Sequence, residues 1–150
     1  MFIIKGVRIT VAQSNDAVAI RKVIKAAYAV WSVRLPDLPD VAGGVDEDIA
    51  AGRVWIAVEK EVIVGCLIGG MVSGRWHLAN IAGSPDQGGR GVGKALMAFA
   101  LVEAARLDAA EMTLATHRKM LGVIALYKRL GWEVSGEDGN KIMMRRSTHE

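Results

Sequence analysis

The chain is built around a glycine-rich segment, Ser84-Pro85-Asp86-Gln87-Gly88-Gly89-Arg90-Gly91-Val92-Gly93-Lys94-Ala95-Leu96. This segment follows the apolar run Trp76–Ala82, which has the composition of a strand. Beyond it, apolar residues recur at helical spacing, namely Ala95, Leu96, Phe99 and Val102. The pattern therefore predicts a strand, a glycine turn and a helix that begins near Gly91 and Gly93.

The start of this helix has the properties of an anion site. The first backbone N–H groups of a helix lack partners inside it, and the helix dipole favours negative charge there. Glycines leave the main chain open to a ligand, and the side chains of Arg90 and Lys94 add positive charge. We therefore expect a phosphate cradle made of Gly88, Gly89, Arg90, Gly91, Val92, Gly93 and Lys94.

Two common phosphate-binding motifs do not fit the segment. The P-loop pattern G-x-x-x-x-G-K-[S/T] is matched from Gly88 to Lys94, but Ala95 offers no oxygen where that motif holds magnesium. The dinucleotide fingerprint fails at Leu96, where a third small residue is needed for close helix packing. An ordinary loop whose glycines only serve turn geometry remains an alternative.

A second segment, at the end of another helical pattern, reads Ala125-Leu126-Tyr127-Lys128-Arg129-Leu130-Gly131-Trp132. Together and in this order, the two segments resemble the GNAT superfamily of acetyl-CoA-dependent N-acetyltransferases. Members of that family read V-x-P, then a turn ending in G-x-G or G-x-A, and later l-Y-x-x-l-G-[F/W/Y]. The resemblance is clear from Trp76 to Trp132 and extends by element order over almost the whole chain.

The remaining patterns predict the other elements. Strand patterns cover Val7–Ala12, Val54–Glu59, Val62–Met71, Arg75–Ala82, Glu111–Ala115, Trp132–Val134 and Lys141–Arg145, the last two joined by a polar turn at 135–140. Helical patterns run from 14–16 to about Trp31, begin again at Asp46, run from Val92 to about Leu107, and cover Met120–Leu130.

This order of elements predicts an α/β fold with a central mixed sheet. The resemblance implies the GNAT (acyl-CoA N-acyltransferase) fold, with about seven strands, about four flanking helices and splayed central strands. We expect a single domain over residues 1–150, because the length and the 51% of hydrophobic residues suit one core.

The composition argues against nucleic-acid-binding, membrane-spanning, secreted and metal-binding proteins. The net charge of +3 comes without a long basic run, so no nucleic-acid partner is expected. The single cysteine, Cys66, lies in an apolar run, which favours a buried, inert thiol in a reducing compartment. No apolar run is long enough to span a membrane, and no signal sequence is recognisable, so a cytoplasmic protein is expected. No cluster of His, Cys, Asp and Glu has the spacing of metal ligands.

The resemblance implies acetyl-CoA as co-substrate. The cradle would bind its phosphates, and the backbone of Ile81, Ala82 and Gly83 would bind pantetheine and the thioester oxygen. Three positions depart from the family pattern. Gly83 stands where an apolar residue is usual, Gly88 where Gln or Arg is usual, and Met120 where Asn is usual. A non-catalytic GNAT-like protein that binds CoA as a sensor or serves as a partner subunit is therefore an alternative.

Acetyl transfer needs an acid for the departing thiolate and a base for the amine. In the resembled family, a tyrosine at the position of Tyr127 is the acid that protonates the thiolate. A phenol with an ordinary pKa of about 10 stays protonated at neutral pH. The strand before the cradle lacks the glutamate that family members often have, so His77 is the candidate base and His117 a weaker one. A core tyrosine and a structural histidine are the alternatives.

The acceptor pocket is implied near the first helix and the loop after it. Trp31, Asp37 and Asp40 are the candidate substrate-binding residues, because carboxylates would attract a cationic amine. Acidic residues that complement a helix N-terminus are the alternative explanation. The resemblance implies direct transfer of acetyl to a primary amine of a small molecule or peptide, without a covalent intermediate. It also implies a homodimer.

Overall fold

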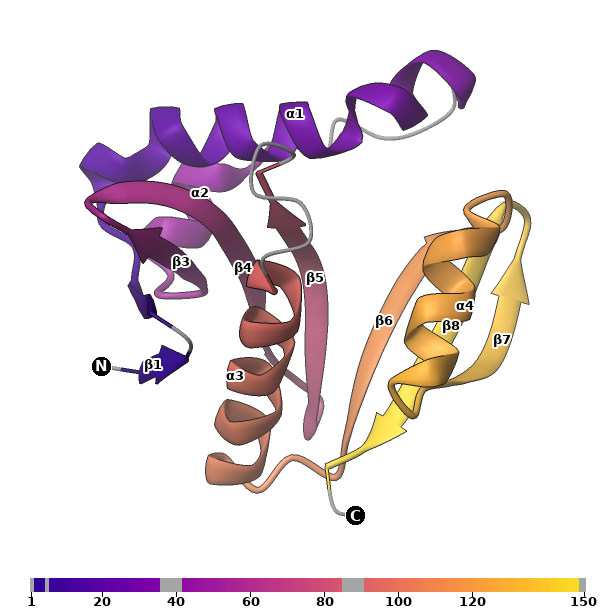
Figure 1. The fold of residues 1–150 in the computed structure, drawn as a ribbon. Helices are drawn as coiled ribbons and strands as arrows, with labels where there is room; N and C mark the ends of the chain where they lie inside the picture. Colours follow the sequence, from indigo (N-terminus) through magenta and orange to yellow (C-terminus); the bar gives the residue numbers. More distant parts are fainter. Residues whose placement is uncertain (1, 5, 36–41, 85–90, 149–150) are drawn as a thin grey trace. The chain divides into compact units, whose positions relative to one another are not determined.

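The computed structural model describes residues 2–4, 6–35, 42–84 and 91–148 (Figure 1). In these residues the strands are β1 (Phe2–Ile4), β2 (Val7–Val11), β3 (Val54–Glu59), β4 (Val62–Val72), β5 (Arg75–Gly83), β6 (Glu111–His117), β7 (Glu133–Asp138) and β8 (Lys141–Ser147). The helices are α1 (Ala17–Arg34), α2 (Val45–Ala50), α3 (Val92–Arg106) and α4 (Leu121–Arg129), and a short 3-10 helix at Ser14–Asp16 precedes α1.

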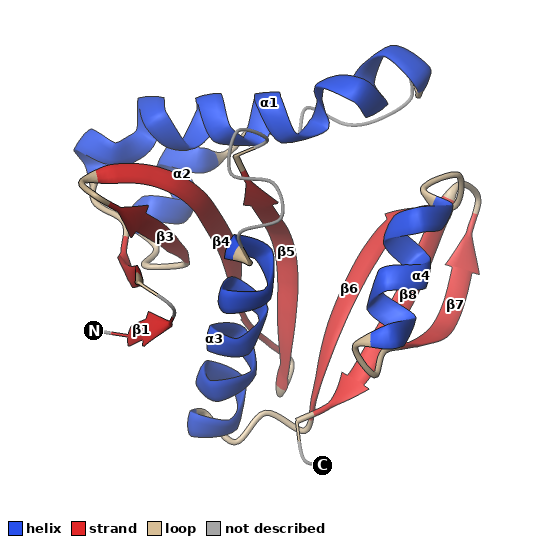
Figure 2. Ribbon diagram, viewed as in Figure 1, coloured by secondary structure: helices blue, strands red, loops and turns tan. Residues whose placement is uncertain are grey.

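The described strands form one mixed sheet in the order β1-β2-β3-β4-β5-β6-β8-β7 (Figure 2). Strands β5 and β6 pair in parallel, whereas the pairs β2–β3, β3–β4, β6–β8 and β7–β8 are antiparallel. A parallel pair needs a crossover connection, and α3 supplies it between β5 and β6. The predicted α/β fold with a mixed sheet is confirmed, with eight strands in the described part of the chain.

Three element predictions need correction. Strand β1 was not expected, because three residues are too short to show a period; Phe2 packs edge-on against Phe99 at 5.3 Å. Helix α1 continues past Trp31 to Arg34. The predicted polar turn is mostly strand, because β7 continues to Asp138 and pairs with β8 as far as Lys141. Strand β7 is the last in the strand order, so polar side chains can point into solvent there.

The hairpin between β3 and β4 is confirmed and has an unusual turn. Lys60 and Glu61 both adopt positive φ angles, 50° and 66°. Two consecutive left-handed residues are the signature of a type I′ turn, which normally uses Asn or Gly. The strands on either side therefore hold this turn in place, since its own residues disfavour it.

The chain divides into two compact units. The first comprises 1–69 and 80–100 and the second 70–79 and 101–150, so β4, β5 and α3 contribute to both. In the first unit, α1 and α2 cover one face of the sheet with Ile20, Ile24 and Val45 against Ile56 and Cys66. Because neighbouring strand residues point to opposite faces, Gly65 faces the other side, where α3 packs.

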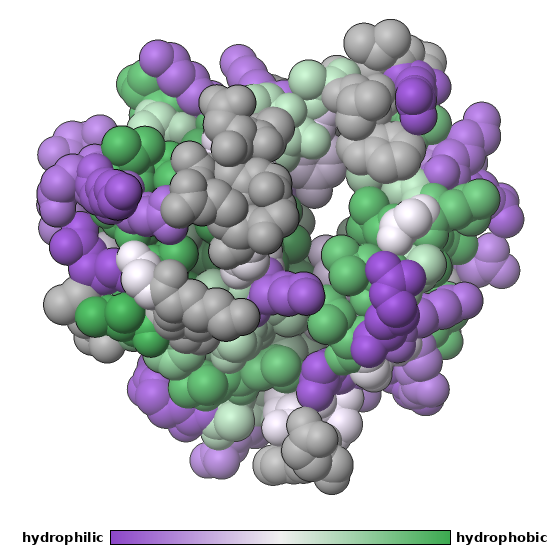
Figure 3. All heavy atoms as spheres, in the orientation of Figure 1, coloured by the Kyte–Doolittle hydropathy of each residue, from purple (hydrophilic) through white to green (hydrophobic). Residues whose placement is uncertain are grey.

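In the second unit, one face of the sheet carries the buried side chains of Met112, Leu114, Ile142 and Met144. The end of α4 lies on this face, because Arg146 pairs with Met112 in the ladder and donates to the Leu130 carbonyl oxygen. Hydrophobic and hydrophilic residues alternate on the surface over α4 (Figure 3). None of the helices in the described part of the chain has the length and hydropathy that a membrane-spanning helix needs.

Candidate functional site

The start of α3 is the described part of the predicted cradle. Its first helical hydrogen bond runs from the Ala95 N–H to the Gly91 carbonyl oxygen at 2.9 Å. The amides of Val92, Gly93 and Lys94 therefore precede that bond and belong to the open end of the helix. Gly91 has a φ of +81°, which glycine adopts without a steric penalty. Gly88, Gly89 and Arg90 lie outside the described residues.

The backbone at this helix start is accessible. Among the described residues, no atom lies within 4 Å of a Cβ built on Gly91 or Gly93, so none of them covers the main chain at either position. Val92 is 4% exposed and anchors the first turn in the core, while Gly93 and Lys94 are exposed. An open main chain, a helix N-terminus and a lysine side chain are the components of an anion site.

The conformation of Gly91 leads to a prediction about the helix start. Replacing Gly91 with alanine should lower the free energy of unfolding by about 1–2 kcal/mol, because an L-residue is strained at this positive φ. Replacing Gly93 with alanine is the matched control, since its Cβ also meets no atom of the described residues and its φ is not positive. Urea unfolding of both variants measures the difference; equal midpoints would contradict the prediction.

The start of α3 also packs against β4 through a glycine that sequence reasoning missed. A Cβ on Gly65 would lie 2.6 Å from Val92 Cγ1, 3.0 Å from the Ala82 carbonyl oxygen and 3.1 Å from Leu96 Cδ1. The Ser84 N–H donates to the carbonyl oxygen of Val64, the residue before Gly65, at 2.8 Å. A glycine within an apolar strand is the available signal for such a close approach.

The three residues expected to bind pantetheine end β5. Ala82 is 4% exposed and belongs to the core cluster, whereas Ile81 and Gly83 are half-buried. A Cβ on Gly83 would make ordinary contact with Val92 Cγ1 at 3.8 Å, so alanine would fit there. The structure thus brings Ala82 and Gly83 beside Val92 in one unit, and their role toward a thioester stays a prediction.

Tyr127 occupies the last turn of α4 and is fixed by the way the helix ends. The Trp132 N–H donates to the Tyr127 carbonyl oxygen at 3.0 Å, and the Gly131 N–H donates to that of Lys128 at 3.1 Å. With Gly131 at a φ of +95°, these bonds form a Schellman motif. The Tyr127 and Trp132 rings pack edge to face at 5.7 Å, the hydrophobic contact that accompanies this motif.

This arrangement explains the spacing of the second sequence segment. Glycine is needed for the left-handed residue, and an aromatic residue after it can reach back to the tyrosine ring. Arg146 of β8 completes the cap by donating to the Leu130 carbonyl oxygen, with its guanidinium lying over Gly131. The geometry positions the Tyr127 side chain and leaves its role as an acid a prediction.

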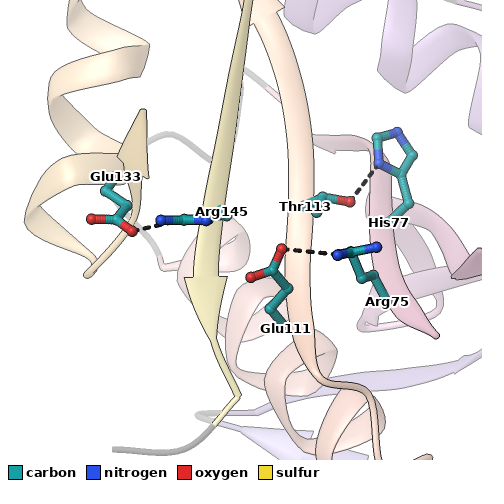
Figure 4. A network of polar contacts seen from close by, with 6 residues as sticks. All are labelled: Arg75, His77, Glu111, Thr113, Glu133 and Arg145. Carbon is teal, nitrogen blue, oxygen red and sulfur yellow. Dashed lines mark hydrogen bonds and ion pairs between the residues drawn. The ribbon is translucent and has the colours of Figure 1, made fainter. Parts of the chain in front are cut away.

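His77 lies on the face of the second unit opposite the buried methionines. Its Nδ1 is 2.9 Å from the hydroxyl oxygen of Thr113, the residue paired with it across the β5–β6 ladder (Figure 4). Burial of the half-buried ring, and then the positive charge of Lys141, hold the pKa of His77 below its ordinary value. The imidazole therefore favours its neutral form, which a general base requires.

His117, the weaker candidate, is differently placed. It is 8% exposed at the end of β6, and its Nδ1 accepts the backbone N–H of Lys119 at 3.1 Å. Its Nδ1 is therefore engaged in a hydrogen bond with the turn that leads into α4. This bond gives His117 a part in the turn, and its role as a base stays a prediction.

The candidate acceptor residues are only partly placed. The backbone of Trp31 belongs to the last turns of α1, and Asp37 and Asp40 lie outside the described residues. Another contact of α1 was not predicted: the Tyr28 hydroxyl donates to Asn80 Oδ1 of β5 at 3.2 Å. It joins α1 to the residue just before Ile81, and only tertiary packing, not sequence pattern, brings the two together.

Two further ionisable groups, Cys66 and Tyr28, are buried in the first unit. Burial raises the pKa of the Cys66 thiol to about 12, which agrees with the predicted buried and inert cysteine. Burial and then the nearby Cys66 raise the pKa of Tyr28. Within the described ranges, no three residues among His, Cys, Asp and Glu are grouped so that they could hold a metal ion.

A protein-family model matches most of the chain. Residues 19–132 match the family described as "Acetyltransferase (GNAT) family". This match includes both sequence segments, the start of α3 and the end of α4. No curated protein sequence matches the chain.

Solved structures share the fold at low sequence identity. PaiA N-acetyltransferase from Thermoplasma acidophilum, solved in complex with coenzyme A, has a TM-score of 0.83 and 14% identity, over 94% of this chain and 98% of that one. The ribosomal-protein-S18-alanine N-acetyltransferase from Escherichia coli has a TM-score of 0.74 and 19% identity, over 96% and 95% of the chains. Ard1 from Thermoplasma volcanium has a TM-score of 0.76 and 15% identity, over 97% and 99%.

Proposed function

The chain belongs to the acetyltransferase (GNAT) family, and from this premise we propose that it transfers the acetyl group of acetyl-CoA directly to a primary amine. The acceptor is a small molecule or a peptide. No covalent enzyme intermediate is formed, because the amine attacks the thioester itself.

One observation carries the cofactor part of the proposal, namely the open helix start at Gly91. The amides of Val92, Gly93 and Lys94 precede the first helical hydrogen bond, and no atom of the described residues lies within 4 Å of a Cβ built on Gly91 or Gly93. Coenzyme A carries a pyrophosphate that suits such a site. The likeness in fold to a PaiA N-acetyltransferase solved with coenzyme A supports this assignment.

We assign the chemical roles as follows. Backbone N–H groups at Ile81, Ala82 and Gly83 hold pantetheine and the thioester oxygen, where one donor to developing negative charge is worth about 3 kcal/mol. Tyr127 donates a proton to the departing CoA thiolate, and His77 takes a proton from the amine. Arg90 and Lys94, with the glycines Gly88 and Gly89, complete the cradle for the phosphates.

The proposed acceptor pocket lies near α1 and the residues that follow it. Asp37 and Asp40 would attract a cationic amine, and Trp31 would form a wall of the pocket. One neighbour in fold acts on an alanine of ribosomal protein S18, so a peptide N-terminus is included beside small amines.

One observation favours the alternative of a CoA-binding protein without activity. Met120, where the family often has an asparagine, is 4% exposed, and the Thr116 hydroxyl lies 3.7 Å from its sulfur atom. It therefore serves packing at the start of α4, and a side-chain bond from this position to the cofactor is missing.

Calorimetric titration of the purified protein with acetyl-CoA, CoA and Mg-ATP tests the proposal, followed by thiol-release assays on a panel of small amines and peptides. Binding of acetyl-CoA with turnover on any amine supports the enzyme. Binding without turnover supports the non-catalytic alternative. If neither acetyl-CoA nor CoA binds, the assignment of the cradle to CoA phosphates is refuted. Binding of Mg-ATP alone would instead support a P-loop-like nucleotide-binding protein.

The role of His77 predicts a specific pH dependence. Because the pKa of His77 is lowered, the wild-type rate should stay high at neutral pH and fall only as the pH drops below that pKa. Replacing His77 with alanine should reduce kcat/KM at pH 7 by about 10²-fold and remove this acidic limb. The measurement is kcat/KM from pH 5 to 9 for both proteins; an unchanged limb in His77→Ala would exclude His77 as the base.

A further inference from the structure

The two ring nitrogens of His77 have different surroundings. Nδ1 lies 2.9 Å from Thr113 Oγ1, and the other nitrogen, Nε2, points away from Thr113 (Figure 4). Because the threonine hydroxyl occupies Nδ1, only Nε2 can exchange a proton with a substrate. The position of the second ring proton then decides whether His77 can act as a base.

The 2.9 Å distance allows two placements of that proton. If the Thr113 hydroxyl donates to Nδ1, the neutral ring carries its proton on Nε2 and has no lone pair to offer there. If Nδ1–H donates to the hydroxyl oxygen, the lone pair is on Nε2. In this second arrangement the same hydrogen bond persists when Nε2 gains a proton, so no group has to rotate during the reaction.

We propose that Thr113 is a positioning residue, whose hydroxyl oxygen accepts the Nδ1 proton of His77 and keeps Nε2 as the proton-accepting nitrogen. This rests on the base role given to His77 above. In the step itself, an ammonium group of the acceptor gives one proton to Nε2 and regains its nitrogen lone pair. The imidazolium carries protons on both nitrogens until Nε2 returns its proton to water.

The charges around the pair fit a neutral partner. Arg75 of β5 is bound to Glu111 of β6 at 3.1 Å, and Arg145 of β8 is bound to Glu133 of β7 at 2.8 Å (Figure 4). These charges are therefore paired, and Lys141 of β8 is the cation that acts on His77. A carboxylate in place of Thr113 would favour the charged imidazolium, whereas a hydroxyl fixes the tautomer without adding charge.

The first test measures the tautomer without using activity. The full chain is labelled with ¹⁵N-histidine, and long-range ¹H–¹⁵N spectra are recorded above the pKa of His77; His77→Gln identifies its signals among those of the three histidines. The wild type should carry its proton on Nδ1. Thr113→Val should shift the population toward the Nε2–H form, and Thr113→Ser should restore the wild-type pattern.

A wild-type ring protonated on Nε2, or a tautomer unchanged in Thr113→Val, would overturn the proposal. Thermal unfolding and acetyl-CoA titration of both threonine variants show that they are folded. If Thr113→Val does not fold, the spectra of the wild type and of Thr113→Ser still test the proposal, because the Nδ1–H form is expected in both.

The second test measures the effect on turnover. Thr113→Val should lower kcat about five- to tenfold, the loss expected for one hydrogen bond, while the KM for acetyl-CoA stays the same. Thr113→Ser should stay within about twofold of wild type. Unchanged kcat in Thr113→Val would contradict the positioning role. If the spectra behave as expected but His77→Ala keeps the acidic limb, the base assignment fails and the tautomer assignment stands.

Discussion

Gly65→Ala should be the most destabilising single-methyl change in the first unit, lowering the free energy of unfolding by about 3 kcal/mol. The added Cβ would lie 2.6 Å from Val92 Cγ1 and 3.0 Å from the Ala82 carbonyl oxygen. The contact with Val92 could be relieved by rotating this side chain or by moving the first turn of α3, whereas the contact with the Ala82 carbonyl oxygen requires a shift of the backbone at the end of β5. Both are parts of the proposed cofactor site, so the affinity for CoA should fall as well.

Gly83→Ala is the matched control for this change. Its Cβ would also face Val92 Cγ1, but at 3.8 Å, which is ordinary contact. We expect its unfolding free energy to stay within about 0.5 kcal/mol of wild type. Urea unfolding measures stability, and calorimetric titration with CoA measures the second effect. Wild-type stability of Gly65→Ala would contradict the close approach of α3 to β4.

A double variant separates steric conflict from other causes. Val92→Ala removes the methyl group that lies nearest to the added Cβ. If the conflict is steric, Gly65→Ala combined with Val92→Ala should be less destabilised than the sum of the single variants, by about 1 kcal/mol or more. Additive losses would mean that the cost of Gly65→Ala arises elsewhere in the strand.

Tyr127→Phe should strongly reduce turnover. Removing the phenol proton should lower kcat by about 10²-fold, because the thiolate then leaves without an acid. The affinity for acetyl-CoA and the unfolding free energy should change little, because the Schellman motif uses the Tyr127 carbonyl oxygen and phenylalanine keeps the ring contact with Trp132. Thiol release at saturating acetyl-CoA measures kcat.

The contrast with Tyr127→Leu makes this test specific. Leucine removes the hydroxyl and also the ring that packs on Trp132 at 5.7 Å, so it should lose both turnover and stability. If Tyr127→Phe keeps wild-type turnover while Tyr127→Leu is destabilised, the tyrosine serves packing alone and the acid role is refuted.

Local features of the fold could be predicted from the sequence. The strand, glycine turn and helix around Gly91 follow from periodicity and from the conformational needs of glycine. The end of α4 is equally local, because Tyr127, Gly131 and Trp132 contact one another within six positions. Strand β1 escaped prediction because three residues show no period, and the second half of β7, from Ser135 to Asp138, because a polar edge strand resembles a turn.

The contacts that matter most for the proposed site were not predictable. Gly65 meets Val92, Tyr28 meets Asn80 and His77 meets Thr113 across large sequence separations. Each pair depends on the register of neighbouring strands or on the docking of a helix, which a single sequence does not encode in any local pattern. The family resemblance supplied His77 and Tyr127 as candidates, but it could not supply their partners.

The left-handed turn at Lys60 and Glu61 has an evolutionary consequence. Each of these residues costs about 1–2 kcal/mol relative to the Asn and Gly that such turns prefer. The pairing of β3 with β4 offsets this cost, so the hairpin forms although its turn residues oppose it. At this position the natural sequence lies below its attainable stability, as expected where selection maintains a threshold of stability and exerts no pressure for a maximum.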